Sequence, residues 1–304
     1  MGAQHVHLSK EFSEGQSFEL QKLIPCTMTV GDQIPDSTTI LVDGRPPDSA
    51  LSFVRSVVVP FAGIPEVTRL RMLAHPSVQL YNLHFNCRAT GELAVALLLA
   101  AARRVVSADS RLRTGQWAWR TEDDPGISLY GKTATIYGYG EVGKVVGQAL
   151  EGLGMTVIGV RRSGGVSLDE ALSNSHALVV TAPLTDETQG AITSQRLRLL
   201  KEPRLVCNVG RGPIIDELAL YEACRSGEVA AAGIDVWYRY PSEEEPNILP
   251  SALPFHDLEN VVLSPHRAGS TSTIESERII AIAEVIKAIC SDEPPKPVDV
   301  TQGY

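Results

Sequence analysis

The sequence has few cysteines, and their arrangement suggests neither a covalent bridge nor a metal site. The five cysteines are scattered, odd in number and never spaced as C-x-x-C, so we expect neither disulfides nor bound metal. No stretch approaches the roughly 18 apolar residues of a membrane helix. The opening residues, MGAQHVHLSKEFSEGQ, contain no apolar core of signal-peptide length. We therefore expect a cytoplasmic protein that does not enter a membrane.

The sequence is also poor in basic residues relative to acidic ones. It has 27 Lys and Arg against 36 Asp and Glu, which gives a formal net charge of -9. Because a negatively charged protein repels phosphate backbones, we predict no nucleic-acid partner, although a local basic patch can still hold a phosphorylated cofactor. The chain has 304 residues, which is enough for two domains.

One stretch carries the pattern of a dinucleotide-binding turn. In TATIYGYGEVG, residues 133–143, a β-branched run breaks into glycines and then resumes as a helical pattern. Gly138 permits the turn, Gly140 leaves room for a pyrophosphate, and Gly143 lets the helix pack on the strand. A second strand, at 155–160, follows where a βαβ unit requires it. We predict that a dinucleotide binds at this helix N-terminus; a purely structural turn is the alternative.

The end of that second strand indicates which dinucleotide is bound. In proteins that bind NAD, an acidic residue about 20 positions after the glycines binds the ribose 2′-hydroxyl. Here the strand runs into Arg161, Arg162 and Ser163, with no carboxylate among them. Arginine offers a bidentate fork to phosphate oxygens, so we predict a preference for NADP. The alternative is that both arginines are simply solvated and that NAD is bound less selectively.

Short apolar strands alternate with helices along most of the chain. Outside the glycine-rich unit, strands are predicted at 38–42, 56–59, 78–81, 177–182, 204–209, 230–236 and 260–264, with weaker ones at 18–23 and 28–30. Helices are predicted at 46–54, 91–104, 167–173, 188–200, 216–226 and 272–290, the last with a capping box of Ser272 and Glu275. This order predicts an α/β fold with a parallel, doubly wound sheet.

Two further stretches suggest a ligand contact and a subunit contact. The segment PFAGIP follows a predicted strand, so we predict that the backbone of Ala62 and Gly63 binds a carboxylate; a simple turn is the alternative. The helix at 91–104 is apolar all round, which indicates burial on several sides. With Trp117 and Trp119 it predicts a subunit interface, against the alternative of an exposed loop.

Four motifs stand in a fixed order along the chain: GYGEVG at 138–143, NVGRGPIIDE at 208–217, GIDVW at 233–237 and SPHRAG at 264–269. Together they resemble the D-isomer-specific 2-hydroxyacid dehydrogenase family, over a stretch from about Phe61 to Ala283. The resemblance implies an NAD(P)-dependent enzyme that is specific for the D configuration. It also implies a doubly wound, parallel-sheet Rossmann cofactor domain, 87–267, inserted into a smaller flavodoxin-like α/β substrate domain, 1–86 and 268–304. A homodimer built on 91–119 is a further implication.

The resemblance also assigns catalytic residues. The arginine of N-x-x-R-G corresponds to Arg211, the histidine of S/T-P-H to His266, and the aspartate that contacts the nicotinamide carboxamide to Asp235. The chemistry agrees, because reducing a 2-keto acid needs a cation for the carboxylate and ketone and an acid for the forming alkoxide. Arg211 and His266 both follow predicted strands, so we expect them at one edge of the sheet. A surface arginine and a loop histidine are the alternatives.

The motifs and the resemblance together imply a wider set of contacts. For the cofactor, the predicted residues are Gly138, Tyr139, Gly140, Glu141, Val142, Gly143, Arg161, Arg162, Ser163, Ala182, Pro183, Thr188, Val209, Gly210, Asp235 and His266. For the substrate, they are Ala62, Gly63, Asn86 and Arg211.

One position departs from the family pattern. The family usually has a glutamate that partners the histidine, five residues after the position of Asp235, and this chain has Tyr240 there. The acids at 243–245 and Asp257 are alternative partners, although this acidic run is more typical of a solvated loop. We include Tyr240 among the candidate catalytic residues.

The sequence therefore predicts an NADP-preferring reductase of a small 2-keto acid such as glyoxylate or hydroxypyruvate. Two other functions stay open. Corepressors that sense dinucleotides share this fold, and the missing glutamate is compatible with such a non-catalytic role. The related formate dehydrogenases also have an uncharged residue at the glutamate position, and Asn86 matches their substrate asparagine.

Overall fold

The computed structural model describes residues 4–9, 11–117, 125–291 and 294–302. Trp119, which the sequence analysis assigns to a subunit interface, lies outside these ranges. None of the helices within them has both the length and the apolar character needed to cross a membrane. All five cysteines are free thiols. In the described part of the chain, no group of three or more His, Cys, Asp or Glu could hold a metal ion.

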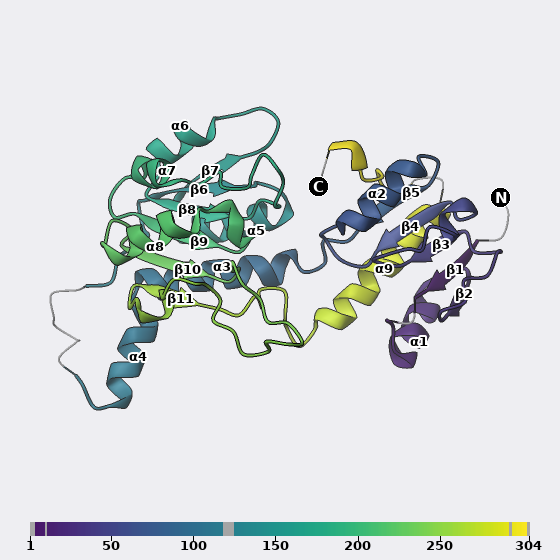
Figure 1. Cartoon of the computed structure of the whole chain (residues 1–304), viewed down its shortest axis with the longest axis horizontal. Helices are drawn as coiled ribbons and strands as arrows, with labels where there is room; N and C mark the ends of the chain where they lie inside the picture. The colour runs from purple at the N-terminus through teal and green to yellow at the C-terminus, as the bar shows by residue number, and fades with distance from the viewer. Residues whose placement is uncertain (1–3, 10, 118–124, 292–293, 303–304) are drawn as a thin grey trace. The chain divides into compact units, whose positions relative to one another are not determined.

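The chain divides into two compact units, each with its own parallel sheet (Figure 1). The smaller unit combines residues 1–86 with 270–304, and the larger unit is the continuous stretch 87–269. The larger unit is therefore inserted into the sequence of the smaller one. Which unit binds cofactor and which binds substrate stays a prediction.

The smaller unit is built on a five-stranded parallel sheet with strand order β2-β1-β3-β4-β5. This is the flavodoxin-like order, which reverses beside the first strand. The strands are β1 (His5–Leu8), β2 (Thr27–Val30), β3 (Ile40–Val42), β4 (Ser56–Val59) and β5 (Gln79–Asn82). The helices are α1 (Glu14–Leu23), α2 (Glu66–Ala74) and α9 (Ile274–Cys290), with 3-10 turns η1 (Ala50–Ser52) and η5 (Val300–Gln302).

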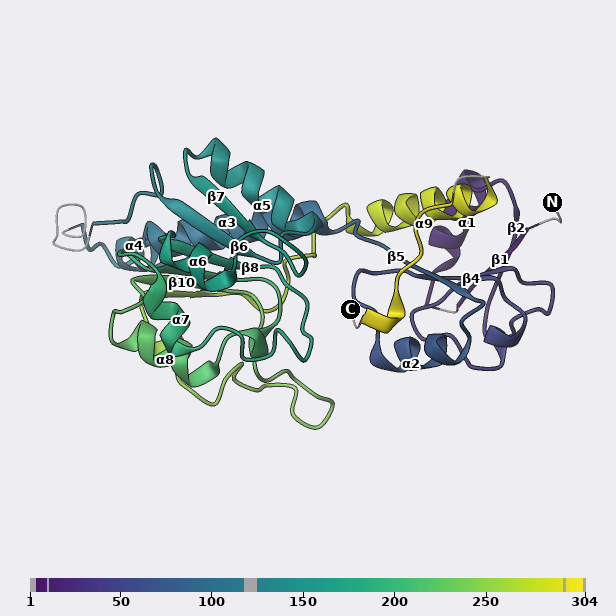
Figure 2. The ribbon, with the colours of Figure 1, turned by 90° about the horizontal axis from the view of Figure 1, so that it is seen from above.

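Each face of this sheet packs against its own helices. The helices α1 and α9 cover one face, and α2 covers the other (Figure 2). Successive residues of a strand point to opposite faces. Ile40 and Val42 accordingly belong to the same buried cluster as Ile282 of α9, whereas Leu41 clusters with Met72 of α2. Part of this core therefore comes from a helix that follows the larger unit in the sequence.

Two sequence predictions about helix starts in the smaller unit are wrong. Residues 18–23 are not a strand but the end of α1. This helix begins with a capping box, in which the Ser13 hydroxyl accepts from the Gln16 backbone N–H and the Gln16 side chain accepts from the Ser13 N–H. At α9 the N-cap is Thr273, which makes no side-chain capping bond, so the box expected at Ser272 does not form. The same sequence signal was present at both places, and only the first one caps a helix.

The larger unit contains a six-stranded parallel sheet with strand order β11-β10-β9-β8-β6-β7. The strands are β6 (Thr133–Tyr137), β7 (Thr156–Val160), β8 (Ala177–Val180), β9 (Leu205–Asn208), β10 (Ala231–Ile234) and β11 (Val261–Leu263). The helices are α3 (Cys87–Ala102), α4 (Val105–Arg113), α5 (Glu141–Gly152), α6 (Leu168–Ser173), α7 (Ser194–Leu199) and α8 (Glu217–Arg225), with 3-10 turns η3 (Gly212–Ile214) and η4 (Phe255–Asp257). The doubly wound, parallel α/β prediction is confirmed.

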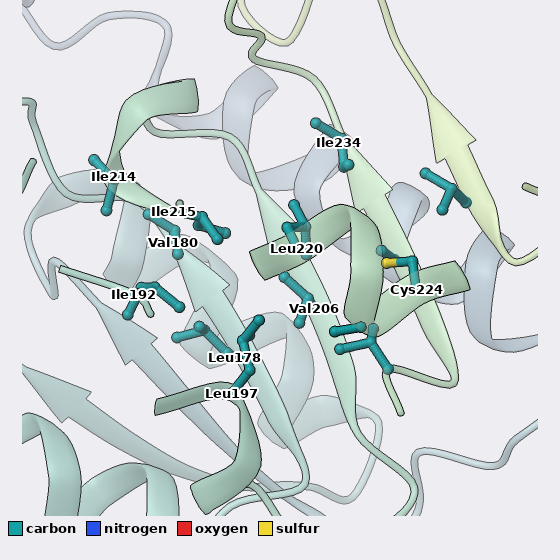
Figure 3. Close-up of a cluster of buried hydrophobic side chains, with 14 of the residues drawn as sticks. Leu178, Val180, Ile192, Leu197, Val206, Ile214, Ile215, Leu220, Cys224 and Ile234 are labelled. Carbon is teal, nitrogen blue, oxygen red and sulfur yellow. The ribbon is translucent and has the colours of Figure 1, made fainter. Parts of the chain in front are cut away.

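Buried side chains fill both faces of this larger sheet. One cluster joins the strands to α7 and α8, and Figure 3 shows Leu178, Val206 and Ile234 of the strands with Leu197 and Leu220 of these helices. The other cluster joins the sheet to α3 and α5. Because both faces are covered, the accessible part of the sheet is the edge where the strands end and loops begin.

The helices α3 and α4 follow one another but differ in burial. An added Cβ on Gly91 of α3 would lie 2.5 Å from the Val145 side chain of α5, and one on Gly233 of β10 would lie 2.8 Å from the Leu97 Cβ of α3. The apolar helix predicted at 91–104 is therefore buried on several sides. By contrast, α4 has no buried residue.

Two predicted helices are shortened by turn-forming residues. At 46–54 only η1 forms, because Pro47 keeps the residue before it extended and the Ser52 hydroxyl donates to the Ser49 carbonyl. At 188–200 only α7 forms, and it starts after Thr193. Gly190, with φ of 63°, interrupts the helical conformation there.

Candidate functional site

The glycine-rich segment turns the chain sharply from β6 into α5. Gly138 has φ of 101°, a conformation that favours glycine, and an added Cβ would overlap the backbone of Ala182. At Gly143 an added Cβ would lie 2.7 Å from the Gly138 carbonyl oxygen. Gly140 caps α5, and nothing lies within 4 Å of the position of its missing Cβ. The first turn of α5 is therefore open to an anion, and its N–H donors fit a dinucleotide pyrophosphate.

Two side chains in this turn have partners within the protein. The Tyr139 ring packs against Gly159 of β7, where an added Cβ would lie 2.5 Å from a ring atom. The Arg161 guanidinium carbon lies 5.4 Å from the centre of the same ring. Glu141 forms an ion pair with Lys144, with 2.6 Å between Oε1 and Nζ. The predicted contacts of Tyr139 and Glu141 with a cofactor are therefore best made by their backbone.

The strands on either side of β6 end in loops of opposite charge. The loop after β7 begins with Arg161, Arg162 and Ser163, all exposed. The loop after β8 carries Glu187, and Arg162 Nε lies 3.2 Å from Glu187 Oε2. One of the two arginines predicted to bind the 2′-phosphate is therefore already paired with a carboxylate.

The loop after β8 is shaped by its own hydroxyl groups. The Thr188 hydroxyl donates to the Pro183 carbonyl at 2.7 Å and accepts from the Thr185 N–H at 2.8 Å. Ala182 is buried at the start of the loop, and its carbonyl oxygen lies 2.7 Å from the position of a Cβ on Gly210. The loops after β8 and β9 therefore run close together, which brings the predicted cofactor residues on both into one area.

The loop after β9 presents Arg211, and Asn208 holds its shape. Asn208 is buried; its Nδ2 donates to the Arg211 carbonyl and its Oδ1 accepts from the Gly210 N–H, both at 3.1 Å. Val209 between them is buried. Arg211 is exposed, and its Nη1 donates to the Gly210 carbonyl at 2.7 Å. No carboxylate of the described residues pairs with it, so most of its five N–H donors stay available to an anion.

The loop after β11 presents His266, and Asp235 of the neighbouring strand end fixes that loop. Asp235 is fully buried. Its Oδ1 accepts from the Ser264 hydroxyl at 2.5 Å and from the Arg267 N–H at 2.9 Å, and its Oδ2 accepts from the Ala268 N–H at 3.0 Å. His266 lies between these donors with φ of 53°. Because a carboxylate has about four lone-pair positions, little of Asp235 is left for the predicted carboxamide contact.

Tyr240 packs beside His266 through its ring. The two ring centres are 5.4 Å apart. The Tyr240 hydroxyl accepts from the Trp237 N–H at 3.1 Å, and the Trp237 indole N–H donates to the Ser264 carbonyl at 2.8 Å. Tyr240 is therefore tied to the loop that it comes from, and the hydroxyl is not bonded to the imidazole.

The acids near this loop do not replace the family glutamate. Glu245 Oε2 lies 3.9 Å from Arg239 Nη2, and Asp257 Oδ1 lies 3.6 Å from His256 Nε2. Among the described residues, no carboxylate forms an ion pair with His266.

The surroundings of His266 favour its neutral form. The residue keeps an exposed edge, but the protein around it desolvates the ring, which lowers the pKa of His266. The charge of the Arg211 guanidinium lowers this pKa further, and the Asp235 carboxylate opposes both effects. Arg211 and His266 are thus close enough for the charge of one to influence the protonation of the other.

The three other predicted substrate residues belong to the smaller unit. Ala62 and Gly63 follow β4 and are partly exposed, as is Asn86. The side chain of Asn82, the last residue of β5, donates to the Ala62 carbonyl at 2.6 Å and so holds this loop. Their role in substrate binding stays a prediction.

The sequence analysis missed residues that organise the site without being candidates themselves. Asn208 and Ser264 stand inside the motifs, and Trp237 ends a third one, so their positions were visible. Their roles were not, because each depends on how the loops fold: Asn208 bonds to the backbone within its own loop, whereas Ser264 and Trp237 join the loops after β10 and β11. Glu187 lies in no motif and gave no signal beyond its charge.

Comparison with known proteins relates the chain to one family. Residues 95–268 match the family model described as D-isomer specific 2-hydroxyacid dehydrogenase, NAD binding domain. The chain is 36% identical to a glyoxylate reductase of Korarchaeum cryptofilum over 219 residues, which cover 68% of this chain and 64% of that protein. It is 34% identical to a glyoxylate reductase of Aeropyrum pernix over 264 residues, which cover 76% of this chain and 77% of that protein. The first of these matches thus spans less than two thirds of the relative.

One solved structure shows the same fold over the whole chain. It is a D-isomer specific 2-hydroxyacid dehydrogenase from Xanthobacter autotrophicus Py2, determined in complex with NADPH and MES. Its TM-score is 0.79 at 24% identity, and the match covers 100% of both chains.

Proposed function

Because the chain belongs to the D-isomer-specific 2-hydroxyacid dehydrogenase family, we propose that it reduces a small 2-keto acid with a nicotinamide dinucleotide as hydride donor. Glyoxylate and hydroxypyruvate are the substrates we propose first, with a D product where the product is chiral. The observation that carries the proposal is the joint presentation of Arg211 and His266 at the carboxyl edge of one sheet, beside the open turn into α5.

The two side chains have complementary tasks in this reaction. Arg211 has free N–H donors that suit a substrate carboxylate and the adjacent ketone oxygen, which it polarises. Protonated His266 gives its proton to the oxygen that becomes the new hydroxyl. The bound dinucleotide supplies the hydride to the carbonyl carbon. Asn208 and Asp235 hold the two loops, so the cation and the acid are positioned before substrate arrives.

We further propose that NADPH is preferred over NADH. Arg161, Arg162 and Ser163 follow β7 where an NAD-binding protein has a carboxylate. The Xanthobacter neighbour was determined with NADPH, which agrees with this choice. NAD stays the alternative cofactor.

A homodimer through 91–119 is part of the same proposal. The helix α4 has no buried residue and exposes Val105, Val106 and Leu112, and Trp117 is 69% exposed. Apolar and aromatic side chains of this kind are enriched in subunit interfaces. Sedimentation of the wild type and of a Val106→Asp variant would test it: a monomeric wild type contradicts the dimer.

The decisive experiment is turnover on a panel of small acids. Glyoxylate, hydroxypyruvate and pyruvate are supplied with NADPH, and formate with NADP, and the change in NADPH absorbance is followed. We expect reduction of at least one 2-keto acid, with loss of that activity in Arg211→Ala and His266→Ala. Arg211→Lys is the matched control that keeps the charge without the fork.

Each alternative has its own outcome in this panel. Tight NADPH binding with no turnover of any acid would favour a dinucleotide-sensing protein. Oxidation of formate in the absence of 2-keto acid reduction would favour the formate dehydrogenase branch.

A further inference from the structure

The ion pair between Arg162 and Glu187 joins two loops that flank the dinucleotide turn. The strand order β8-β6-β7 places β6 between the other two strands, as Figure 1 also shows. The glycine-rich turn follows β6, Arg162 follows β7, and Glu187 lies in the loop after β8. Because parallel strands end at the same edge of a sheet, this pair spans the edge beside the turn.

Glu187 is held in this position by an ordered turn. The Thr188 N–H donates to the Thr185 carbonyl at 3.1 Å, and the Gln189 N–H donates to the same carbonyl at 2.9 Å. The hydroxyl of Thr188 closes the loop on Pro183. The negative charge of Glu187 also contributes to a raised pKa of Tyr137, behind the larger effect of burial. Its carboxylate therefore lies near the end of β6 as well as near Arg162.

The two arginines after β7 are consequently not equivalent. Arg162 shares a carboxylate with both Nε and Nη2, at 3.2 and 3.4 Å from the Glu187 oxygens. Arg161 lies over the Tyr139 ring and has no carboxylate partner among the described residues. A phosphate group can use Arg161 directly, whereas it must compete with Glu187 for Arg162.

We infer that Glu187 sets the cofactor selectivity of this chain. Its ion pair with Arg162 competes with the 2′-phosphate of NADPH for that arginine, and its carboxylate can bind the ribose 2′-hydroxyl of NADH instead. This inference rests on the proposed dinucleotide binding. The Glu187 carboxylate repels a 2′-phosphate. NAD-binding proteins usually have an acidic residue at the end of the strand equivalent to β7, and here Glu187 in the loop after β8 takes its place. Arg161 is then the principal phosphate ligand, and Glu187 keeps the preference for NADPH moderate.

The test is cofactor binding to Glu187→Gln, which needs no knowledge of the substrate. Titration of the intact protein with NADPH and with NADH gives the two dissociation constants by fluorescence. We expect NADPH to bind three- to fivefold more tightly than in the wild type, since an exposed ion pair is worth up to about 1 kcal/mol. NADH should bind equally or up to about twofold more weakly. Glu170→Gln, which removes an exposed acid from the first turn of α6, is the control and should change neither constant.

The pairwise nature of the effect is tested by a double-mutant cycle. In an Arg162→Gln background, Glu187→Gln should improve NADPH binding by less than twofold, because no guanidinium is left to release. The difference between Glu187→Gln and wild type should also shrink at high salt.

The outcomes separate this inference from the proposed function. If both dinucleotides bind but Glu187→Gln leaves their affinity ratio unchanged, the role of Glu187 is wrong and the proposed function stands. If Glu187→Gln weakens NADPH binding, Glu187 orients Arg162 for the phosphate, and the inference is overturned with the opposite sign. If neither dinucleotide binds the wild type, the proposed function itself fails.

Discussion

The two halves of the larger sheet present their loops in different ways. Buried side chains hold the loops after β9, β10 and β11: Asn208, 1% exposed, bonds within the loop after β9, and Asp235, fully buried, joins the loops after β10 and β11. The loops after β7 and β8 are joined by an ion pair whose side chains, Arg162 and Glu187, are 51% and 66% exposed. The loops after β9, β10 and β11, the fixed half, therefore have their geometry before a ligand binds. In the loops after β7 and β8, the exchangeable half, a side chain can leave its protein partner for a ligand.

The difference has an energetic basis. A hydrogen bond to a buried charged group contributes about 1.5–3 kcal/mol, and losing one partner leaves a desolvated group unsatisfied. An exposed ion pair contributes about 0–1 kcal/mol and is screened by salt. Catalytic groups need the first kind of support, because a displacement of about 1 Å can cost a hundredfold in rate. An exposed ion pair is sufficient to discriminate between cofactors with and without a 2′-phosphate.

The largest effect is expected from the two groups that the fixed half presents. Arg211→Ala and His266→Ala should each reduce kcat/KM for 2-keto acid reduction by at least about a hundredfold, the usual scale for oxyanion and acid-base groups. Steady-state kinetics give the rates, and NADPH titration with thermal melting should show binding and folding unchanged. Unimpaired turnover in either variant would contradict the mechanism.

A somewhat smaller effect on the reaction rate is expected when Asp235, which holds the His266 loop, is changed and the catalytic residues are kept. In Asp235→Asn an amide N–H faces backbone donors, so a buried donor is left unsatisfied, at about 1–3 kcal/mol. The melting temperature should fall by several degrees, and reduction should slow roughly tenfold or more because the His266 loop loosens. Asp216→Asn is the control: this exposed N-cap of α8 should tolerate the change, since Asn caps equally well. If both variants behave like the wild type, the loop does not depend on Asp235.

An intermediate effect is expected in the exchangeable half. Arg161→Gln combined with Arg162→Gln should lower the preference for NADPH over NADH by about tenfold, near the low end for charge-assisted phosphate contacts because the site is exposed. Of the single variants, Arg161→Gln should have the larger effect, since Glu187 already occupies Arg162. A ratio of affinities that survives in the double variant would show that the arginines do not read the phosphate.

The smallest effects are expected at Tyr240, where the fixed half lacks its usual carboxylate. The pKa of His266 is lowered by desolvation and by Arg211, and reduction needs its protonated form. The reductive rate should therefore decline as pH rises through a value below the ordinary histidine pKa of about 6.5. Tyr240→Glu should move this decline upward by up to about one pH unit, because an opposite charge favours imidazolium.

The control for the Tyr240 prediction is Tyr240→Phe, which keeps the ring beside His266 but removes the acceptor of the Trp237 N–H. We expect an unchanged pH profile and a loss of no more than about threefold, since the hydroxyl serves its own loop. NMR titration of the His266 ring gives the pKa independently of turnover. A glutamate variant with the wild-type profile would contradict the proposed proximity.

Local patterns were sufficient to predict most of the strands and the strand ends. The strand at 56–59 and the turn at Gly138 follow from β-branched runs and glycine spacing, which depend on neighbours in the sequence. The capped helix at 14–23 was also predictable, because Ser13 and Gln16 have capping-box spacing. The apolar residues at 18–23 favour a strand instead, and such a pattern is ambiguous over so few residues.

The supporting bonds of the site could not be predicted in the same way. Asp235 finds its donors some thirty residues later, in a loop with no regular structure. The pairing of Arg162 with Glu187 depends on β7 and β8 lying on either side of β6, which is a property of the strand order. Motifs therefore located the reacting groups, and the tertiary structure identified what holds them.

The use of α9 in the core of the smaller unit has a consequence for biosynthesis. Ile279, Ile282 and Ile286 of this helix complete a cluster begun by β1, β3 and β4. During translation those strands leave the ribosome before the larger unit does, and the helix only after it. At about 5–20 residues per second, roughly 180 intervening residues impose a delay on the order of 10 to 40 s. Throughout that interval α1 can cover this face of the nascent sheet but α9 cannot, so we expect the part of the face beneath α9 to bind chaperones until that helix arrives.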